Sequence, residues 1–284
     1  MFYSPLRYPG GKGKLSQWVS DFLRHNKLSG GVYVEPYAGG AGVALFLLLQ
    51  EYVDHIVIND ADPVIYSFWW SAINETEALI ALINDGPVTL EARQKHIQVI
   101  NSPESHSILD VGFATFFLNR TNRSGILKAG VIGGKGQSGQ YKIDARYNKQ
   151  KLIDRIKLIA KYKNRITILS QDALELLQNP PIDGFKKSLI YLDPPYFNKG
   201  SQLYRNFYNP EDHAAIRDAV NELTSPWLIT YDNCDEINAL YSGYPIHDFS
   251  ITYSTHMSRK KGSEVLIHPD NLNLHSIPFS STAA

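Results

Sequence analysis

The sequence predicts an α/β protein with a doubly wound, mostly parallel sheet that is interrupted by a mainly helical, loop-rich insertion. Short apolar runs, which suit buried parallel strands, occur towards both ends of the chain and alternate with helical patterns. The middle of the chain instead combines helical stretches with a glycine-rich segment. We therefore expect a sheet domain of residues 1–70 and 165–279, an inserted domain of residues 71–164, and a tail of residues 280–284.

Composition narrows the class of protein. The 284 residues suffice for one large domain or two modest ones with a sizeable core. No apolar run approaches the roughly 20 residues of a membrane-spanning helix, and the N-terminus lacks the pattern of a signal peptide. Cys234 is the only cysteine, which excludes an internal disulfide and a four-thiolate zinc site and suits a reducing cytoplasm. We expect no metal site.

Residues 4–14 form a glycine- and lysine-containing loop ahead of a helix that is expected near Leu15. Glycine permits close approach of the backbone to a ligand, and Lys12 and Lys14 add positive charge, so this is an anion-binding loop in general form. It is not a phosphate-binding P-loop, because Leu15 follows Lys14 where that motif needs Ser or Thr. A simple N-terminal turn would leave the same pattern.

The first predicted strand, residues 32–34, leads into a glycine-rich turn and a helix over residues 43–49. The turn reads Glu35-Pro36-Tyr37-Ala38-Gly39-Gly40. Strand, glycine-rich turn and helix form the nucleotide-binding first unit of a doubly wound sheet. The glycine spacing differs from that of the dinucleotide fingerprint, so we predict a nucleoside-type cofactor. A tight turn with glycines for packing is the alternative.

An acid follows the second predicted strand, residues 55–58, at the position where a carboxylate can hold a ribose diol. Asp60 fits that role in spacing and context. Asp60 or Asp62 could instead cap the helix expected over residues 64–73, and Asp62, which precedes Pro63, suits the cap better. After the third strand, residues 166–169, Asp172 either caps a helix or reaches a bound nucleobase.

A strand over residues 189–192 ends abruptly in Asp193-Pro194-Pro195-Tyr196. The prolines fix φ and offer no N–H, so they end the strand. A carboxylate, two carbonyls and an aromatic ring therefore gather at the carboxyl edge of the sheet, where ligands bind in open α/β folds. A proline turn with Asp193 as a cap is the alternative. A helix over residues 211–223 and strands at 227–231, 247–253 and 264–268 complete the domain.

Positive charge is concentrated in the middle of a chain whose net formal charge is zero. Residues 120–165 carry 13 Lys or Arg and 2 Asp, a local formal charge of +11. Such a block indicates a polyanion-binding face, although a solvated, lysine-rich helix face has the same composition. Aromatic and basic residues after the proline tetrapeptide and at a later hairpin tip also suit stacked bases and phosphates.

These motifs, taken in order, resemble those of the Dam-type DNA adenine methyltransferases. The resemblance rests on Tyr8-Pro9-Gly10-Gly11-Lys12 (an N-terminal cofactor motif), residues 34–40 (the glycine-rich motif), Asp60 (the ribose acid), residues 116–120 (the start of target recognition) and residues 193–196 (the catalytic tetrapeptide). The loop after Arg120 departs from the members that methylate GATC, so the target sequence is left open.

The resemblance implies a Rossmann-like methyltransferase sheet, S-adenosylmethionine as cofactor and double-stranded DNA as substrate. It also allows a cognate restriction enzyme as a partner, and it implies that the protein is a monomer or a weak dimer. It implies that Asp193 and the Pro194 carbonyl accept hydrogen bonds from the amine of a flipped adenine on which Tyr196 stacks. Lys12 would pair with the cofactor carboxylate. The implied cofactor residues are Tyr8, Gly11, Lys12, Glu35, Pro36, Tyr37, Gly39, Gly40, Asp60, Asp172 and Asp193. The implied DNA-binding residues are Asn119, Arg120, Asn122, Arg123, Lys128, Lys199, Tyr204, Arg259 and Lys260.

Two other functions stay open. Related proline-containing tetrapeptides serve other planar amines, so the substrate could be RNA or a protein glutamine amide; alternatively, the fold could serve as a non-catalytic DNA-binding module. The basic, glycine-rich insert favours DNA, and the intact Asp193 and Lys12 favour catalysis. A zinc-dependent base deaminase is disfavoured because one cysteine cannot supply the usual ligands.

Overall fold

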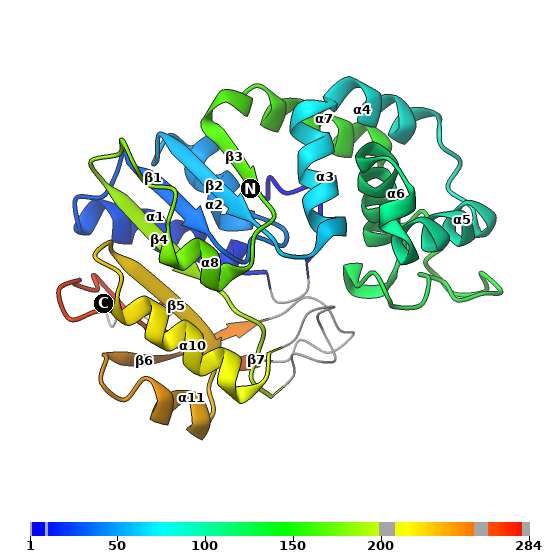
Figure 1. The fold of residues 1–284 in the computed structure, drawn as a ribbon. Helices are drawn as coiled ribbons and strands as arrows, with labels where there is room; N and C mark the ends of the chain where they lie inside the picture. Colours follow the sequence, from blue (N-terminus) through cyan, green and yellow to red (C-terminus); the bar gives the residue numbers. More distant parts are fainter. Residues whose placement is uncertain (1, 9–10, 199–207, 253–260, 280–284) are drawn as a thin grey trace.

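The structure, a computed structural model, describes residues 2–8, 11–198, 208–252 and 261–279 (Figure 1). Four residues expected to contact DNA, Lys199, Tyr204, Arg259 and Lys260, and the tail of residues 280–284 lie outside these ranges. Among the described residues, no helix is long and apolar enough to cross a membrane.

Seven strands form one sheet in the order β3-β2-β1-β4-β5-β7-β6. The strands are β1 (Val32–Glu35), β2 (His55–Asn59), β3 (Ile166–Leu169), β4 (Ser188–Leu192), β5 (Trp227–Asp232), β6 (Ile246–Thr252) and β7 (Lys261–Ile267). β1 to β5 run parallel, whereas β7 pairs antiparallel with both β5 and β6. The expected doubly wound, mostly parallel sheet is confirmed, and each strand-like run of the sequence forms a strand.

Successive side chains of the central strands enter two separate apolar layers, as the period of two requires. In β1, Tyr33 packs in one buried cluster, while Val32 and Val34 pack in the other. The first layer contains α1 (Ser16–His25) and α2 (Gly42–Leu49). The second contains α8 (Ala173–Gln178), α10 (Pro210–Asn221) and α11 (Asp235–Leu240). Helices therefore cover both faces, which explains why these strands read as continuous apolar runs.

A helical lobe follows β2 and stands beside the sheet (Figure 1). It consists of α4 (Thr76–Asp85), α5 (Leu90–Asn101), α6 (Ile108–Thr121) and α7 (Lys149–Ala160), with the short 3-10 turns η2 (Pro103–Ser105) and η3 (Arg123–Gly125). Two further 3-10 turns, η1 (Gly13–Leu15) and η4 (Lys163–Arg165), precede α1 and β3. The lobe is the mainly helical insertion that the sequence predicts.

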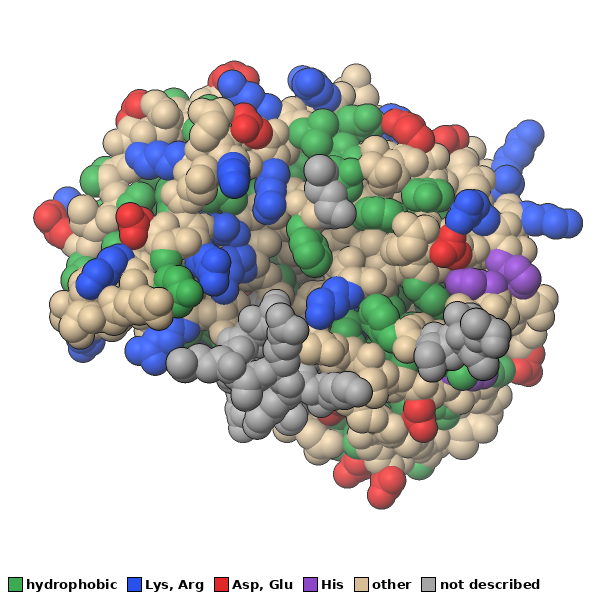
Figure 2. Space-filling model, turned by 180° about the vertical axis from the view of Figure 1, so that it is seen from behind, with side chains coloured by type: hydrophobic (Ala, Val, Ile, Leu, Met, Phe, Trp, Pro, Cys, Tyr) green, Lys and Arg blue, Asp and Glu red, His purple; other side chains and the backbone are tan. Residues whose placement is uncertain are grey.

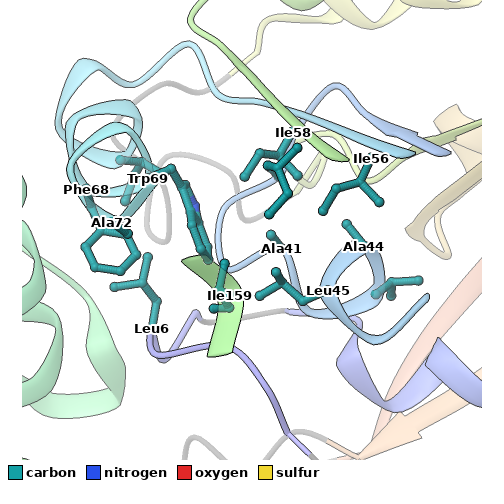
Figure 3. Packing of buried hydrophobic residues seen from close by; sticks show 14 of the residues in the cluster. Leu6, Ala41, Ala44, Leu45, Ile56, Ile58, Phe68, Trp69, Ala72 and Ile159 are labelled. Carbon is teal, nitrogen blue, oxygen red and sulfur yellow. The ribbon is translucent and has the colours of Figure 1, made fainter. Parts of the chain in front are cut away.

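The lobe joins the sheet through α3 (Pro63–Asn74). Asp62 caps the start of this helix as expected, because the Val64 N–H donates to its carboxylate at 3.2 Å. The expected domain boundary at residue 70 falls inside this helix. Figure 3 shows Trp69 beside Ile159, with side chains of α2 and β2 on one side of the indole and Leu6 on the other. All of these residues belong to one buried cluster, so the sheet and the lobe share a continuous core.

Candidate active site

A cavity of about 800 Å³ lies at the carboxyl edge of the sheet, at the ends of β1, β2 and β4. The sheet order reverses between β1 and β4, and doubly wound sheets bind their ligands at that point. All the residues expected to bind a cofactor line this cavity: Tyr8, Gly11, Lys12, Glu35, Pro36, Tyr37, Gly39, Gly40, Asp60, Asp172 and Asp193. The structure thus brings together motifs that lie far apart in the sequence.

Asp60 holds the glycine-rich loop in place through a hydrogen bond to its backbone. The Gly39 N–H donates to its Oδ2 and the Asp62 N–H to its Oδ1, both at 2.9 Å. Gly39 has φ +45°, and a Cβ there would lie 2.6 Å from the Tyr8 ring, so the position accepts only glycine without displacing that ring. Burial raises the pKa of Asp60 to about 7, although the two N–H donors oppose the rise.

Glu35 connects β1 to the start of α2. Its Oε1 accepts hydrogen bonds from the Tyr33 hydroxyl and from the Ala44 N–H, each at 3.1 Å. Burial raises the pKa of Glu35 to about 8 against these donors. Sequence reasoning missed Asn59, whose amide donates to the Pro36 and Gln171 carbonyls at 2.9 and 3.0 Å and ties together the loops after β1 and β3.

Asp172 has the first of the two roles that the sequence left open, the helix cap, and its contact with a nucleobase stays a prediction. Its Oδ1 accepts from the Leu174 N–H at 2.8 Å and caps α8, while the residue also lines the cavity. Nearby, the Tyr37 and Tyr208 hydroxyls lie 3.0 Å apart. A helix cap therefore does not prevent Asp172 from facing a ligand.

The Asp193 carboxylate lies in a buried ionic network that the sequence did not predict. Its Oδ1 lies 3.0 Å from the Lys12 ammonium and accepts from the Thr230 hydroxyl at 3.1 Å. The same ammonium lies 3.1 Å from Oε2 of Glu264, whose Oε1 accepts from the Tyr196 hydroxyl at 2.6 Å. Lys12 is only 4% exposed and Glu264 only 1%. Both contacts of Asp193 engage Oδ1, so Oδ2 is the oxygen left for a ligand in the cavity.

The charges of this network are mutually dependent. Burial by itself lowers the pKa of Lys12, but the carboxylates of Asp193 and Glu264 outweigh it and hold that pKa well above its usual value. Burial raises the pKa of Asp193, and Lys12 opposes the rise. Burial raises the pKa of Glu264 in the same way. One ammonium therefore keeps two buried carboxyl groups closer to their ionised form.

Two predictions for this region concern side chains that are already engaged within the protein, and both stay predictions. Lys12 was expected to pair with a cofactor carboxylate, but two protein carboxylates already share its ammonium. Tyr196 was expected to stack on a base, but it is 7% exposed, its hydroxyl is held by Glu264, and it does not line the cavity. Pro194 is also buried. Stacking by Tyr196 would require its ring to be uncovered.

The residues expected to contact DNA fall into two groups. Arg123 and Lys128 are exposed on the lobe, and Arg120 faces the cavity. Figure 2 shows Lys and Arg side chains concentrated on the lobe half and the middle of one face. Asn119 and Asn122, by contrast, are buried at 1% and 0% exposure. Neither amide is exposed in the described conformation, and DNA contact by these two residues stays a prediction.

Both asparagines instead hold loops. The Asn119 amide donates to the carbonyls of Arg7 and Gly125 at 2.8 and 2.9 Å. The Asn122 amide donates to the Leu127 carbonyl at 2.8 Å, and its oxygen accepts from Arg93 at 2.8 Å. Buried amides that satisfy several backbone groups in this way are structural.

The fold and the site together define a class of enzyme. A doubly wound sheet with a glycine-rich first loop, an acid after the second strand and Asp-Pro-Pro-Tyr after the fourth is a methyltransferase arrangement. The family model described as D12 class N6 adenine-specific DNA methyltransferase matches residues 8–257. The chain belongs to this family and is an S-adenosylmethionine-dependent adenine-specific DNA methyltransferase.

Similar proteins come from sequence and from structure comparison. The type II methyltransferase M.MjaIII of Methanocaldococcus jannaschii is 25% identical over 266 residues, which cover 85% of this chain and 88% of that protein. A putative RNA methyltransferase, PH1948 of Pyrococcus horikoshii, has a TM-score of 0.42 and 12% identity, covering 93% of this chain and 84% of its own. The rRNA methyltransferase aviRa of Streptomyces viridochromogenes has a TM-score of 0.35 and 12% identity, with 92% and 86% covered.

Proposed function

We propose that the enzyme transfers a methyl group from S-adenosylmethionine to the exocyclic amine of an adenine that has turned out of a specific site in duplex DNA. The observation that carries the proposal is Asp193. It lies at the carboxyl end of β4, is held through Oδ1 by Lys12 and Thr230, and lines the cavity with its side chain 18% exposed. The cavity that holds the cofactor residues is thus also open to a substrate base.

The donor set of the cavity fits S-adenosylmethionine. The Asp60 carboxylate faces the cavity and suits the ribose hydroxyls, Asp172 suits the nucleobase, and the backbone of Gly39 and Gly40, against which Tyr8 packs, lines the cavity beside them. When bound, S-adenosylmethionine supplies a methyl group on a positively charged sulfur. The sulfur is a good leaving group, because it becomes neutral when the methyl group is transferred, so its departure needs no acid or base.

The protein's task is to activate the amine. The exocyclic nitrogen of adenine is planar because its lone pair is delocalised into the ring. Two acceptors aimed at its N–H groups favour a pyramidal nitrogen. Asp193 lines the cavity and supplies Oδ2, and we assign the second acceptor to the carbonyl of Pro194, the next residue. Because they are fixed before the reaction, their contribution is transition-state stabilisation by placed dipoles. Oδ2 is also the acceptor for the proton that leaves the nitrogen.

A methylation assay with labelled cofactor on duplex DNA, RNA and protein tests the proposal. We expect methyl transfer to adenine in duplex DNA only, and an Asp193→Asn variant that binds cofactor normally but loses about 100- to 1,000-fold in kcat, the usual effect of removing one such transition-state contact. Methylation of RNA or protein instead of DNA, or a near-normal rate for the variant, would contradict it.

A further inference from the structure

Four arginine side chains line the lobe side of the cavity, and we call them the arginine cluster: Arg7, Arg120, Arg146 and Arg155. They come from four separate parts of the chain, namely the N-terminal segment, the end of α6, the loop before α7, and α7 itself. Arg7, Arg120 and Arg155 are half-buried, and Arg146 is exposed. The cluster is therefore a part of the cavity wall and not a solvated helix face.

Hydrogen bonds to the backbone hold the cluster in place. Arg120 Nε donates to the Arg146 carbonyl at 2.7 Å, and Arg155 Nη1 donates to the Ser4 carbonyl at 2.9 Å. The Asn119 side chain accepts from the Arg7 N–H at 2.7 Å and donates to the Arg7 carbonyl at 2.8 Å. A site built in this way keeps its charges together before any ligand arrives.

The cluster has no counter-charge among the described residues. None of the four arginines forms an ion pair with an Asp or Glu there. Nη1 of Arg7 is buried and has no hydrogen-bond partner in the same residues. Burial, followed by repulsion from Arg7, Arg155 and Arg146, lowers the pKa of Arg120 to about 9. Four neighbouring guanidinium groups without a carboxylate repel one another and leave a buried donor unpaired. A bound oxyanion would offset this repulsion and accept that hydrogen bond.

We propose that the arginine cluster binds a phosphodiester group of the substrate DNA, next to the nucleotide whose base enters the cavity. This inference rests on the proposed function. Guanidinium groups match phosphate oxygens in pairs, and they are the preferred donors for that anion. The lobe wall then holds the backbone while the base faces Asp193 on the sheet wall.

The other oxyanion that enters the cavity is the carboxylate of the cofactor. It is part of an amino acid that also carries an ammonium group, which four guanidinium groups would repel. The acidic residues Glu35, Asp60 and Asp193 line the cavity outside the cluster, so an ammonium meets less positive charge there than beside four guanidinium groups. The distribution of charge therefore assigns the phosphate, and not the cofactor carboxylate, to the cluster.

An Arg155→Gln variant tests the assignment against a matched control, Lys157→Gln. Lys157 is exposed two residues further along α7 and does not line the cavity. The probe is a duplex that carries the site found by methylome sequencing of DNA from expressing cells, and binding is measured without cofactor at several salt concentrations. We expect Arg155→Gln to weaken DNA binding about 10- to 100-fold and to reduce the salt slope by about one. Lys157→Gln should change binding less than about threefold.

Cofactor affinity, measured by calorimetry without DNA, separates the two oxyanions. We expect it to be unchanged in Arg155→Gln. A loss of cofactor affinity with an intact DNA salt slope, or equal effects of the two variants on DNA, would overturn the assignment. An Arg155→Lys variant, which keeps the charge but not the forked donor, should recover the slope but only part of the affinity. A wild-type protein that fails to methylate DNA would instead refute the proposed function, so the two failures are distinct.

Discussion

Replacing Lys12 by methionine removes the one ammonium shared by Asp193 and Glu264 and keeps an apolar side chain of similar length. Both carboxyl groups are buried, and Lys12 opposes the rise in the pKa of each. Removing one partner of a buried ion pair costs about 3–5 kcal/mol when the remaining charge stays ionised. Without Lys12, burial acts on Asp193 unopposed by that ammonium, so the pKa of Asp193 should rise further.

The pH dependence gives this prediction a defined sign. In Lys12→Met the folded state holds protons on Asp193 and Glu264 that the unfolded state has already released. The free energy of unfolding therefore falls as pH rises from the ordinary carboxyl pKa to the raised folded value. The raised pKa of Lys12 itself contributes stability that is fully present below the ordinary lysine pKa, so it adds no slope near neutrality. The loss relative to wild type should be about 3 kcal/mol at pH 8 and much smaller at pH 5.

Urea unfolding at pH 5, 6.5 and 8, together with kcat/KM over the same range, measures both effects. The proposed mechanism needs ionised Asp193, so the acid limb of kcat/KM should move to higher pH in the variant. Lys95→Met is the control, because Lys95 forms an exposed ion pair with Glu91 at 3.1 Å and such pairs contribute about 1 kcal/mol at most. Equal losses at pH 5 and pH 8, with an unmoved acid limb, would refute the reasoning.

Two further predictions concern Asp60, which holds the glycine-rich loop, and Asn119, which holds the backbone of Arg7 and Gly125. Since the pKa of Asp60 lies at about 7, cofactor affinity measured by calorimetry should fall about tenfold from pH 8 to pH 6, and Asp60→Asn should remove this fall. Constant affinity in the wild type would exclude an ionised Asp60 as the ribose acceptor. Asn119→Ala should lower the free energy of unfolding, measured in urea, by about 2–3 kcal/mol, since it leaves buried groups of Arg7 and Gly125 unpaired. A change below about 0.5 kcal/mol would contradict a structural role for Asn119.

Much of the fold follows from local sequence. Buried parallel strands are continuous apolar runs, so β1 to β5 are recognisable, and the Pro63 that follows Asp62 marks the start of α3. Glu35, Asp60, Asp172 and Asp193 were also predictable, because they stand at or just after strand ends, whereas Tyr8, Gly11 and Lys12 were assigned to the cofactor by the family resemblance. The short helix α11 was missed, since a six-residue helix has too few positions to show a period.

Contacts between distant residues were not predictable. Lys12 and Glu264 are separated by 252 positions, and nothing in the local sequence of β7 distinguishes Glu264 from a polar residue at a strand end. Asn119 and Asn122 illustrate the opposite case. Polar residues beside arginines resemble a nucleic-acid surface in sequence, whereas in the structure their amides satisfy buried backbone groups. Composition shows which groups are present, but burial decides whether they face a ligand or the chain itself.

The N-terminal segment contacts both the helical lobe and the carboxylate that we propose to be catalytic. The Ser4 carbonyl accepts from Arg155, and the Arg7 backbone is clamped by Asn119, so the segment is attached to the lobe at two points. A few residues later, Lys12 lies 3.0 Å from Asp193. An anion at the arginine cluster therefore acts on the same short stretch of chain that carries the ammonium beside the catalytic carboxylate. Because that ammonium opposes the rise in the pKa of Asp193, the proposed phosphate site and the proposed acceptor for the amine would both depend on the position of this segment.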